Sequence, residues 1–157
     1  MKKLLSILLV LIVVAFNVGA AKIYKGNSTY SGDCLYTYTG GKVYRGNSHY
    51  ASDIIYTYYN GIIYSGNSTY RSDIISCYRD NHAYRGDSNY SLDIIWTYSS
   101  KRVYRGNSSY RSDCILTISN NHVFIGSSTY SSDILITYEG YIPIPVLVIC
   151  AVNSYYL

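Results

Sequence analysis

This 157-residue chain has a small net charge and few long apolar runs. Thirteen lysine and arginine residues against nine acids give a formal charge of +4, and the basic residues are scattered instead of forming the strong basic patch typical of nucleic-acid binding proteins. The apolar runs 4–16 and 142–152 are shorter than the roughly 20 residues of a membrane-spanning helix. These shortages argue against a nucleic-acid partner and against a membrane span in the mature chain.

The residues that usually carry catalysis or bind metals are equally sparse. The three histidines, His49, His82 and His122, lie at variable positions, and no GxSxG motif is present, so nothing supports a nucleophilic triad. In a stacked array, His82 and His122 would be too far apart to share a zinc ion. The aspartates lack the clustered DxD spacing of calcium loops. The sequence therefore predicts no catalytic residue, no cofactor and no metal site.

Repetition is what the chain has in abundance. A 20-residue unit recurs six times over residues 22–141 without insertion or deletion, and residues 43–58 show it as VYRGNSHYASDIIYTY. One glycine, one serine, one tyrosine and one aspartate are the same in all six copies. A strict period of this length means that one supersecondary unit packs against copies of itself.

Each unit has the composition of strands joined by turns. Tyrosine, isoleucine, valine and threonine favour strands, and residues 53–58 alternate in the manner of one. Asn60-Gly61 then predicts a tight hairpin turn, followed in the next copy by a short strand equivalent to 43–46. The fold class is therefore all-β, with tandem 20-residue repeats forming a β-solenoid or a closed strand ring, a knotted ring being one form of the latter.

A polar connection, 47–53 in the second copy, contains the invariant serine, tyrosine and aspartate. Short polar side chains bond to nearby backbone N–H groups and fix turns, which is the role we assign to the serine and aspartate columns. Six equivalent aspartates do not suit catalysis, which needs an acid and a base in different environments. We expect the tyrosine, Tyr50 in this copy, to fold inward as a plug. The predicted turn residues are Asp33, Asp53, Asp73, Asp93, Asp113, Asp133, Ser28, Ser48, Ser68, Ser88, Ser108 and Ser128.

The 22 tyrosines allow two interpretations. Tyrosines that recur every 20 residues can pack on one another as ladders, or their rings can stack on sugars, since tyrosine has an apolar face and a polar tip. The candidate ligand-stacking residues are Tyr44, Tyr64, Tyr84 and Tyr104. Specificity would then lie in the variable column of Lys25, Arg45, Ser65, Arg85, Arg105 and Ile125.

The two ends of the chain differ from the repeats. Residues 1–21 have the basic, apolar and small-residue segments of a signal peptide, with a cut on either side of Ala21; a retained anchor is the alternative. Residues 142–157 lose the glycine and aspartate of the repeat and contain Pro143 and Pro145. They are expected to form a degenerate cap over the last repeat or the closing strand of a ring.

Four cysteines in an exported chain permit disulfides without requiring them. They are Cys34, Cys77, Cys114 and Cys150. Cys34 and Cys114 share one apolar column, so they could instead be small fillers. In an open solenoid they would lie four repeats apart, beyond the roughly 7 Å that a disulfide allows. A bridge between them would therefore indicate a closed structure.

The motif VYxGNSxYxSDI resembles the repeats of septknot-type bacterial β-proteins, matching them at Ser48, Tyr50, Ser52 and Asp53 and at the equivalent residues over 22–141. The resemblance implies a ring of strands whose chain winds into a knot, with no biochemical activity attached. The hairpin segment 57–63 is a departure from that pattern. The repeats are also similar, more weakly, to choline-binding and glucan-binding surface repeats, but only one tryptophan, Trp96, is present to form their ligand cages.

From these observations we expect an exported, non-enzymatic β-repeat protein, periplasmic or extracellular, with a structural or protein-interaction role. The alternative is a cell-surface module that binds an envelope glycan through its tyrosine columns and the Lys/Arg column.

Overall fold

A computed structural model describes residues 19–155 of the chain. Of the predicted signal peptide, residues 1–18 lie outside the described part. Gly19 and Ala20 precede the first strand, and Ala21 is its first residue.

Twelve β-strands of two lengths alternate along the repeats. The six-residue strands are β2 (Cys34–Thr39), β4 (Ile54–Tyr59), β6 (Ile74–Arg79), β8 (Ile94–Ser99), β10 (Cys114–Ser119) and β12 (Ile134–Glu139). The shorter strands are β1 (Ala21–Lys25), β3 (Lys42–Arg45), β5 (Ile62–Ser65), β7 (His82–Arg85), β9 (Arg102–Arg105) and β11 (His122–Ile125). Each long strand and the short strand after it form a tight hairpin, as the repeat pattern predicts.

These strands close into a barrel in which every neighbour is antiparallel. The strands follow one another round the ring in chain order, and β1 completes it by pairing with β12, with Tyr24 opposite Thr137. The closed ring is therefore the correct alternative and the solenoid is not. No connection between the described strands crosses over another strand, so the knotted winding implied by the septknot resemblance is not found.

Backbone conformations with positive φ make the hairpin turns. Asn60 and Gly61 have φ of 48° and 78°, and two successive positive values are what a two-residue hairpin turn requires. A Cβ on Gly61 would lie 2.8 Å from the carbonyl oxygen of Tyr78 on the next hairpin. Neighbouring hairpins thus touch at this end of the barrel, which we call the turn end.

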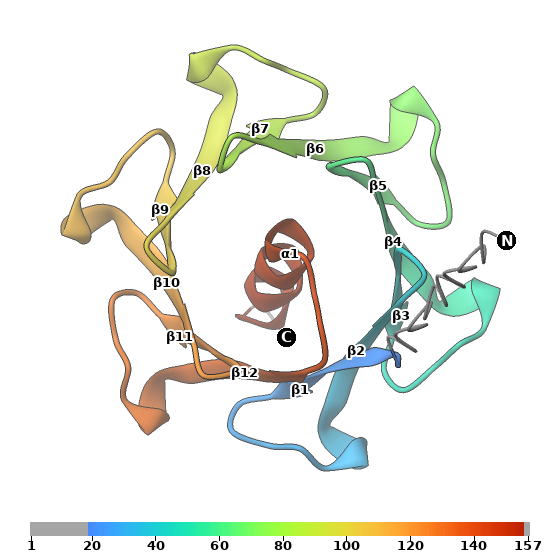
Figure 1. Cartoon of the computed structure of the whole chain (residues 1–157). Coiled ribbons are helices and arrows are strands. Elements are labelled where there is room, and N and C mark those ends of the chain that lie inside the picture. Colours follow the sequence, from blue (N-terminus) through green and yellow to red (C-terminus); the bar gives the residue numbers. More distant parts are fainter. Residues whose placement is uncertain (1–18, 156–157) are drawn as a thin grey trace, which may run out of the picture.

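The lumen of the barrel contains the helix α1 (Ile144–Tyr155), as Figure 1 shows. The sequence predicts a cap or a closing strand over residues 142–157, of which 156 and 157 lie outside the described part; this prediction is wrong for residues 144–155, which form a helix, while β1 and β12 close the ring. Eight strands leave an interior that side chains alone can fill, so twelve leave a wider lumen that needs a plug. A helix that is apolar on all sides suits such a buried position, and Pro145 is tolerated because it lies in the first turn.

The core lies between α1 and the inward faces of the strands. Val43, Val103 and Ile136 are fully buried on the barrel wall, and Leu147 and Val148 are buried on the helix. The chain leaves β12 at the turn end and α1 runs back through the barrel, so the last turn of α1 lies at the opposite end, where the short strands finish. No helix within residues 19–155 is long and apolar enough to cross a membrane.

Six loops project outward from the barrel at that opposite end, each joining a short strand to the next long strand (Figure 1). We call these loops petals and their end of the barrel the petal end. They comprise residues 26–33, 46–53, 66–73, 86–93, 106–113 and 126–133, and each ends in a single 3₁₀ turn.

Candidate functional site

Every petal has the same set of internal hydrogen bonds. In the second petal the Ser48 hydroxyl donates to the Asp53 carboxylate and accepts from the backbone N–H of Tyr50 at 3.2 Å. The N–H of Asp53 donates to the carbonyl oxygen of Tyr50 at 2.9 Å and closes the 3₁₀ turn. The other five petals repeat this pattern. The serine thus bonds to a backbone N–H, whereas the aspartate is held by the serine hydroxyl.

A threonine on the outer face of the barrel holds each petal against the wall. The Thr57 hydroxyl donates to the carbonyl oxygen of Gly66 at 2.8 Å, and Thr57 is 3% exposed. In the copy where Cys77 replaces threonine, the Cys77 thiol and the Arg79 guanidinium both donate to the carbonyl oxygen of Ser88. The petals are therefore fixed both internally and at their base.

The invariant tyrosine of each petal lies in solvent, and the prediction that it folds inward is wrong. Tyr30, Tyr50, Tyr70, Tyr90, Tyr110 and Tyr130 are 72–80% exposed. The backbone of each makes the two hydrogen bonds described above, while no hydrogen bond of its hydroxyl is found within residues 19–155. These six residues, the petal tyrosines, are therefore side chains on fixed backbones with almost no intramolecular contact.

Of the four tyrosines predicted to stack on ligands, two are buried and two are half-buried. Tyr64 and Tyr104 are 7% and 6% exposed, which leaves their rings no free face. Tyr44 and Tyr84 are half-buried: the ring of His49 lies 6.1 Å from that of Tyr44, and the Arg79 guanidinium lies 5.0 Å from the ring centre of Tyr84. This column packs against the outer wall beneath the petals, as a ladder would.

The Lys/Arg column is separate from the petal tyrosines. Arg45 pairs with Tyr36 and Arg105 with Trp96, and directly opposed residues of an antiparallel pair lie on the same face. Because Tyr36 and Trp96 belong to the inner core, this column faces the lumen at the petal end. The glycan site predicted from the sequence combined the tyrosine columns with the Lys/Arg column, and the structure does not bring these together.

The remaining candidates do not converge either. Cys34, Cys77, Cys114 and Cys150 are all free thiols, although the ring is closed. His82 and His122 each contact the carbonyl oxygen of a turn residue. Within residues 19–155, no group of three or more histidine, cysteine, aspartate or glutamate side chains could hold a metal ion.

Comparison with known proteins agrees with the geometry of the ring. A search of curated proteins and a search of solved structures gave no match. The family model described as 6-fold beta flower protein matches residues 20–147, a range that contains all twelve strands, all six petals and the first turn of α1. The six-fold arrangement is the one in Figure 1. The chain is thus a β-repeat protein that belongs to the 6-fold beta flower family.

Proposed function

We propose that this protein is an exported, non-enzymatic module that binds a repeating glycan of the cell envelope through its six petal tyrosines. The observation that carries the proposal is the 72–80% exposure of all six rings on identically bonded loops. Each ring has an apolar face suited to a sugar ring and a hydroxyl suited to its polar groups.

The petal backbone is already fixed by hydrogen bonds, so little conformational entropy is lost when a ligand binds. Both hydrogen-bonding groups of the Tyr50 backbone are engaged, by Ser48 and by Asp53. A tyrosine has only two side-chain torsions to immobilise, so contact area is gained at a small entropic cost. A preorganised ring of this kind suits a binding role better than a catalytic one.

Six copies suit a polymer better than a single small ligand. One exposed ring gives a weak contact, but binding sites linked on one rigid scaffold reach a much higher combined affinity when the ligand repeats. The six petals point in different directions around the ring in Figure 1, so each tyrosine ring can meet a different unit of the ligand.

A folded protein partner fits the petals less well. A stable protein interface buries about 800 Å² on each partner around an apolar centre. On the petals the exposed large hydrophobic residues are the tyrosines and Leu92, and the residues beside Tyr50 and Tyr70 in the sequence are mainly polar or charged. Isolated rings among polar residues favour a hydrated polysaccharide.

The packing of the first strand favours one of the two cleavage positions of the expected signal peptide. Ala21 is 1% exposed at the beginning of β1, and a Cβ on Gly140 would lie 3.0 Å from the Ala21 Cβ. A cut between Ala20 and Ala21 would retain this seam residue, whereas a cut after Ala21 would remove it. We therefore place the cut between Ala20 and Ala21, in a chain that is periplasmic or extracellular.

The test is co-sedimentation of the mature chain with insoluble cell-wall polysaccharide. The triple variant Tyr30→Ala, Tyr70→Ala and Tyr110→Ala should lose most of its binding. Tyr141→Ala is the matched control, because Tyr141 is 72% exposed but lies outside the petals. Retained binding by the folded triple variant would show that the petal tyrosines do not hold the glycan. Failure of the parent chain to sediment with any envelope glycan would show that the glycan is not the ligand.

A further inference from the structure

The petal end of the barrel has an inner rim of positive charge. The last positions of the short strands face the lumen there, and four of the six are basic: Lys25, Arg45, Arg85 and Arg105. We call these four the cation rim. Their inward direction follows from their strand partners, since Lys25 pairs with the fully buried Ile136.

No side-chain carboxylate neutralises this rim. Within residues 19–155 the one ion pair within 4.0 Å joins Arg71 to Asp87 at 3.2 Å, between two petals. The invariant aspartates are held by serines in the petals, and Glu139 accepts from the Tyr24 hydroxyl. The carbonyl end of α1 complements the rim in part, but the cations remain without a carboxylate partner.

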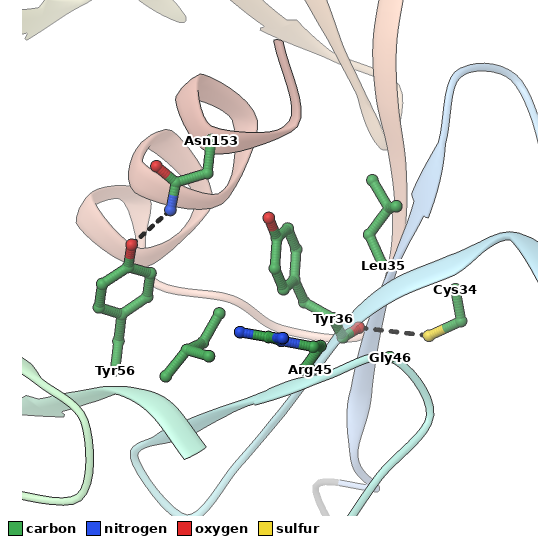
Figure 2. Close-up of a pocket in the computed structure, with 8 residues that line it drawn as sticks. Cys34, Leu35, Tyr36, Arg45, Gly46, Tyr56 and Asn153 are labelled. Atoms are coloured by element: carbon green, nitrogen blue, oxygen red, sulfur yellow. Dashed lines mark hydrogen bonds between the residues drawn. The ribbon is translucent and has the colours of Figure 1, made fainter. Parts of the chain in front are cut away.

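The last turn of α1 does not fill this end of the barrel. One cavity of about 570 Å³ lies between the helix and strands β2, β3 and β4, a size within the usual range of ligand pockets. It is lined by Leu35, Tyr36, Arg45, Ile55, Tyr56 and Asn153, together with Cys34 and Gly46. Figure 2 shows Arg45 and Tyr36 together on one side of this space, with Tyr56 joined to Asn153 across it.

Polar groups converge on this cavity while the rest of its wall is apolar. Tyr36 is 5% exposed, and its hydroxyl has no hydrogen-bond partner within residues 19–155. Burial raises the pKa of Tyr36 to about 12, so at neutral pH the hydroxyl is a proton donor. The hydroxyl oxygen is not itself among the buried unpaired atoms of the described residues, so it can donate to an acceptor that enters the cavity beside Arg45.

We propose that this cavity binds a monocarboxylate with an apolar body, of the medium-chain fatty acid class. The Arg45 guanidinium pairs with the carboxylate, the Tyr36 hydroxyl donates to it, and Leu35 and Ile55 contact the hydrocarbon. A guanidinium matches the planar carboxylate and binds it through paired N–H groups. The site lies inside the barrel and does not depend on the petal tyrosines.

A second cavity provides an internal comparison. It occupies the position four repeats further round the ring, with a volume of about 450 Å³. There Leu116 replaces Tyr36 and Ile125 replaces Arg45, while its one cation, Arg105, comes from β9. A tyrosine also lines the second cavity, but it is Tyr155 on α1, which is 60% exposed, whereas Tyr36 is 5% exposed on the barrel wall. The first cavity therefore combines an arginine with a tyrosine that is buried on the wall, which is why the carboxylate is assigned to the first.

The test is calorimetric titration of the mature chain, recovered after export, with octanoate and with 1-octanol. Octanoate should bind about tenfold more tightly than octanol, because the charged hydrogen bonds are made by the acid alone. Arg45→Gln should remove this preference, and Tyr36→Phe should weaken octanoate binding several-fold. Arg111→Gln, which removes the same charge from a petal, is the control and should bind octanoate as the parent does.

Three results would overturn the proposal: equal affinity for octanoate and octanol, no binding of octanoate by the parent chain, or parental affinity in Arg45→Gln. If Arg45→Gln does not fold, Tyr36→Phe decides the question, since it removes one oxygen atom and keeps the ring. Parental octanoate affinity in Tyr36→Phe would then contradict the site.

Discussion

The bond between serine and aspartate in each petal should make a measurable and non-additive contribution to stability. In the second petal, Ser48→Ala removes the donor to the Asp53 carboxylate and the acceptor for the Tyr50 N–H. Two hydrogen bonds at about 1 kcal/mol each give an expected loss of about 2 kcal/mol. Asp53→Asn keeps the size of the side chain but weakens the bond from Ser48, for a loss of about 1 kcal/mol.

The double variant should lose about 2 kcal/mol, because without Ser48 the charge on Asp53 no longer contributes. The coupling energy is then about 1 kcal/mol, obtained from urea unfolding of the parent, the two single variants and the double variant. The same cycle at Ser108 and Asp113 should give a similar value, since the geometry repeats. Strictly additive losses of about 3 kcal/mol would refute the role given to this pair.

Three further predictions concern the barrel. Leu147→Ala, on the buried face of α1, should cost 2–5 kcal/mol in urea unfolding, against about 1 kcal/mol or less for the more exposed Val152→Ala; equal losses would contradict the plug. Deleting residues 62–81 should abolish folding by circular dichroism, because a ten-strand ring has no room for α1; a folded product would favour an open array. The pKa of Tyr36 is about 12 in the folded protein and 10 in the unfolded chain. Its contribution to the free energy of unfolding is therefore complete below pH 10 and is lost as the pH rises to about 12. Tyr36→Phe should make the free energy of unfolding fall less steeply with pH in this range, and an unchanged slope would contradict the burial of Tyr36.

Much of the barrel could be predicted because its determinants are local. The period of 20 residues, the alternation in 53–58 and the pair Asn60-Gly61 specify strands and hairpins within one repeat. Closure depends on β1 meeting β12, a pairing of residues more than 100 positions apart. Nothing within one repeat distinguishes that closure from continued stacking, so the solenoid and the ring remained equal alternatives.

The helix was missed because its composition is that of a strand. Residues 142–152 are rich in isoleucine and valine and include two prolines, which argues against a helix in isolation. Its conformation is set by the lumen, where a helix satisfies its own backbone groups and buries all its sides. The one sequence signal was an apolar segment immediately after the repeats, and it does not specify a conformation.

The positions of the tyrosine columns could not be predicted from the repeat. The sequence analysis expects Tyr50 and its equivalents to fold inward as plugs, and the variable column of Arg45 to supply specificity beside the ligand-stacking tyrosines. The structure places the invariant rings in solvent and Arg45 at the inner rim. A tyrosine is compatible with either environment, so its place depends on how the petal turns, which Ser48 and Asp53 determine through bonds that sequence spacing alone does not define.

The most direct test of the account is an NMR titration that follows the tyrosine ring signals while a soluble envelope glycan is added to the mature chain. The six petal tyrosines should shift together, and the buried Tyr64 and Tyr104 should remain unchanged. Shifts confined to Tyr36 and Tyr56 at the inner cavity, or the absence of any shift on the petals, would contradict the claim that the petals are the binding surface.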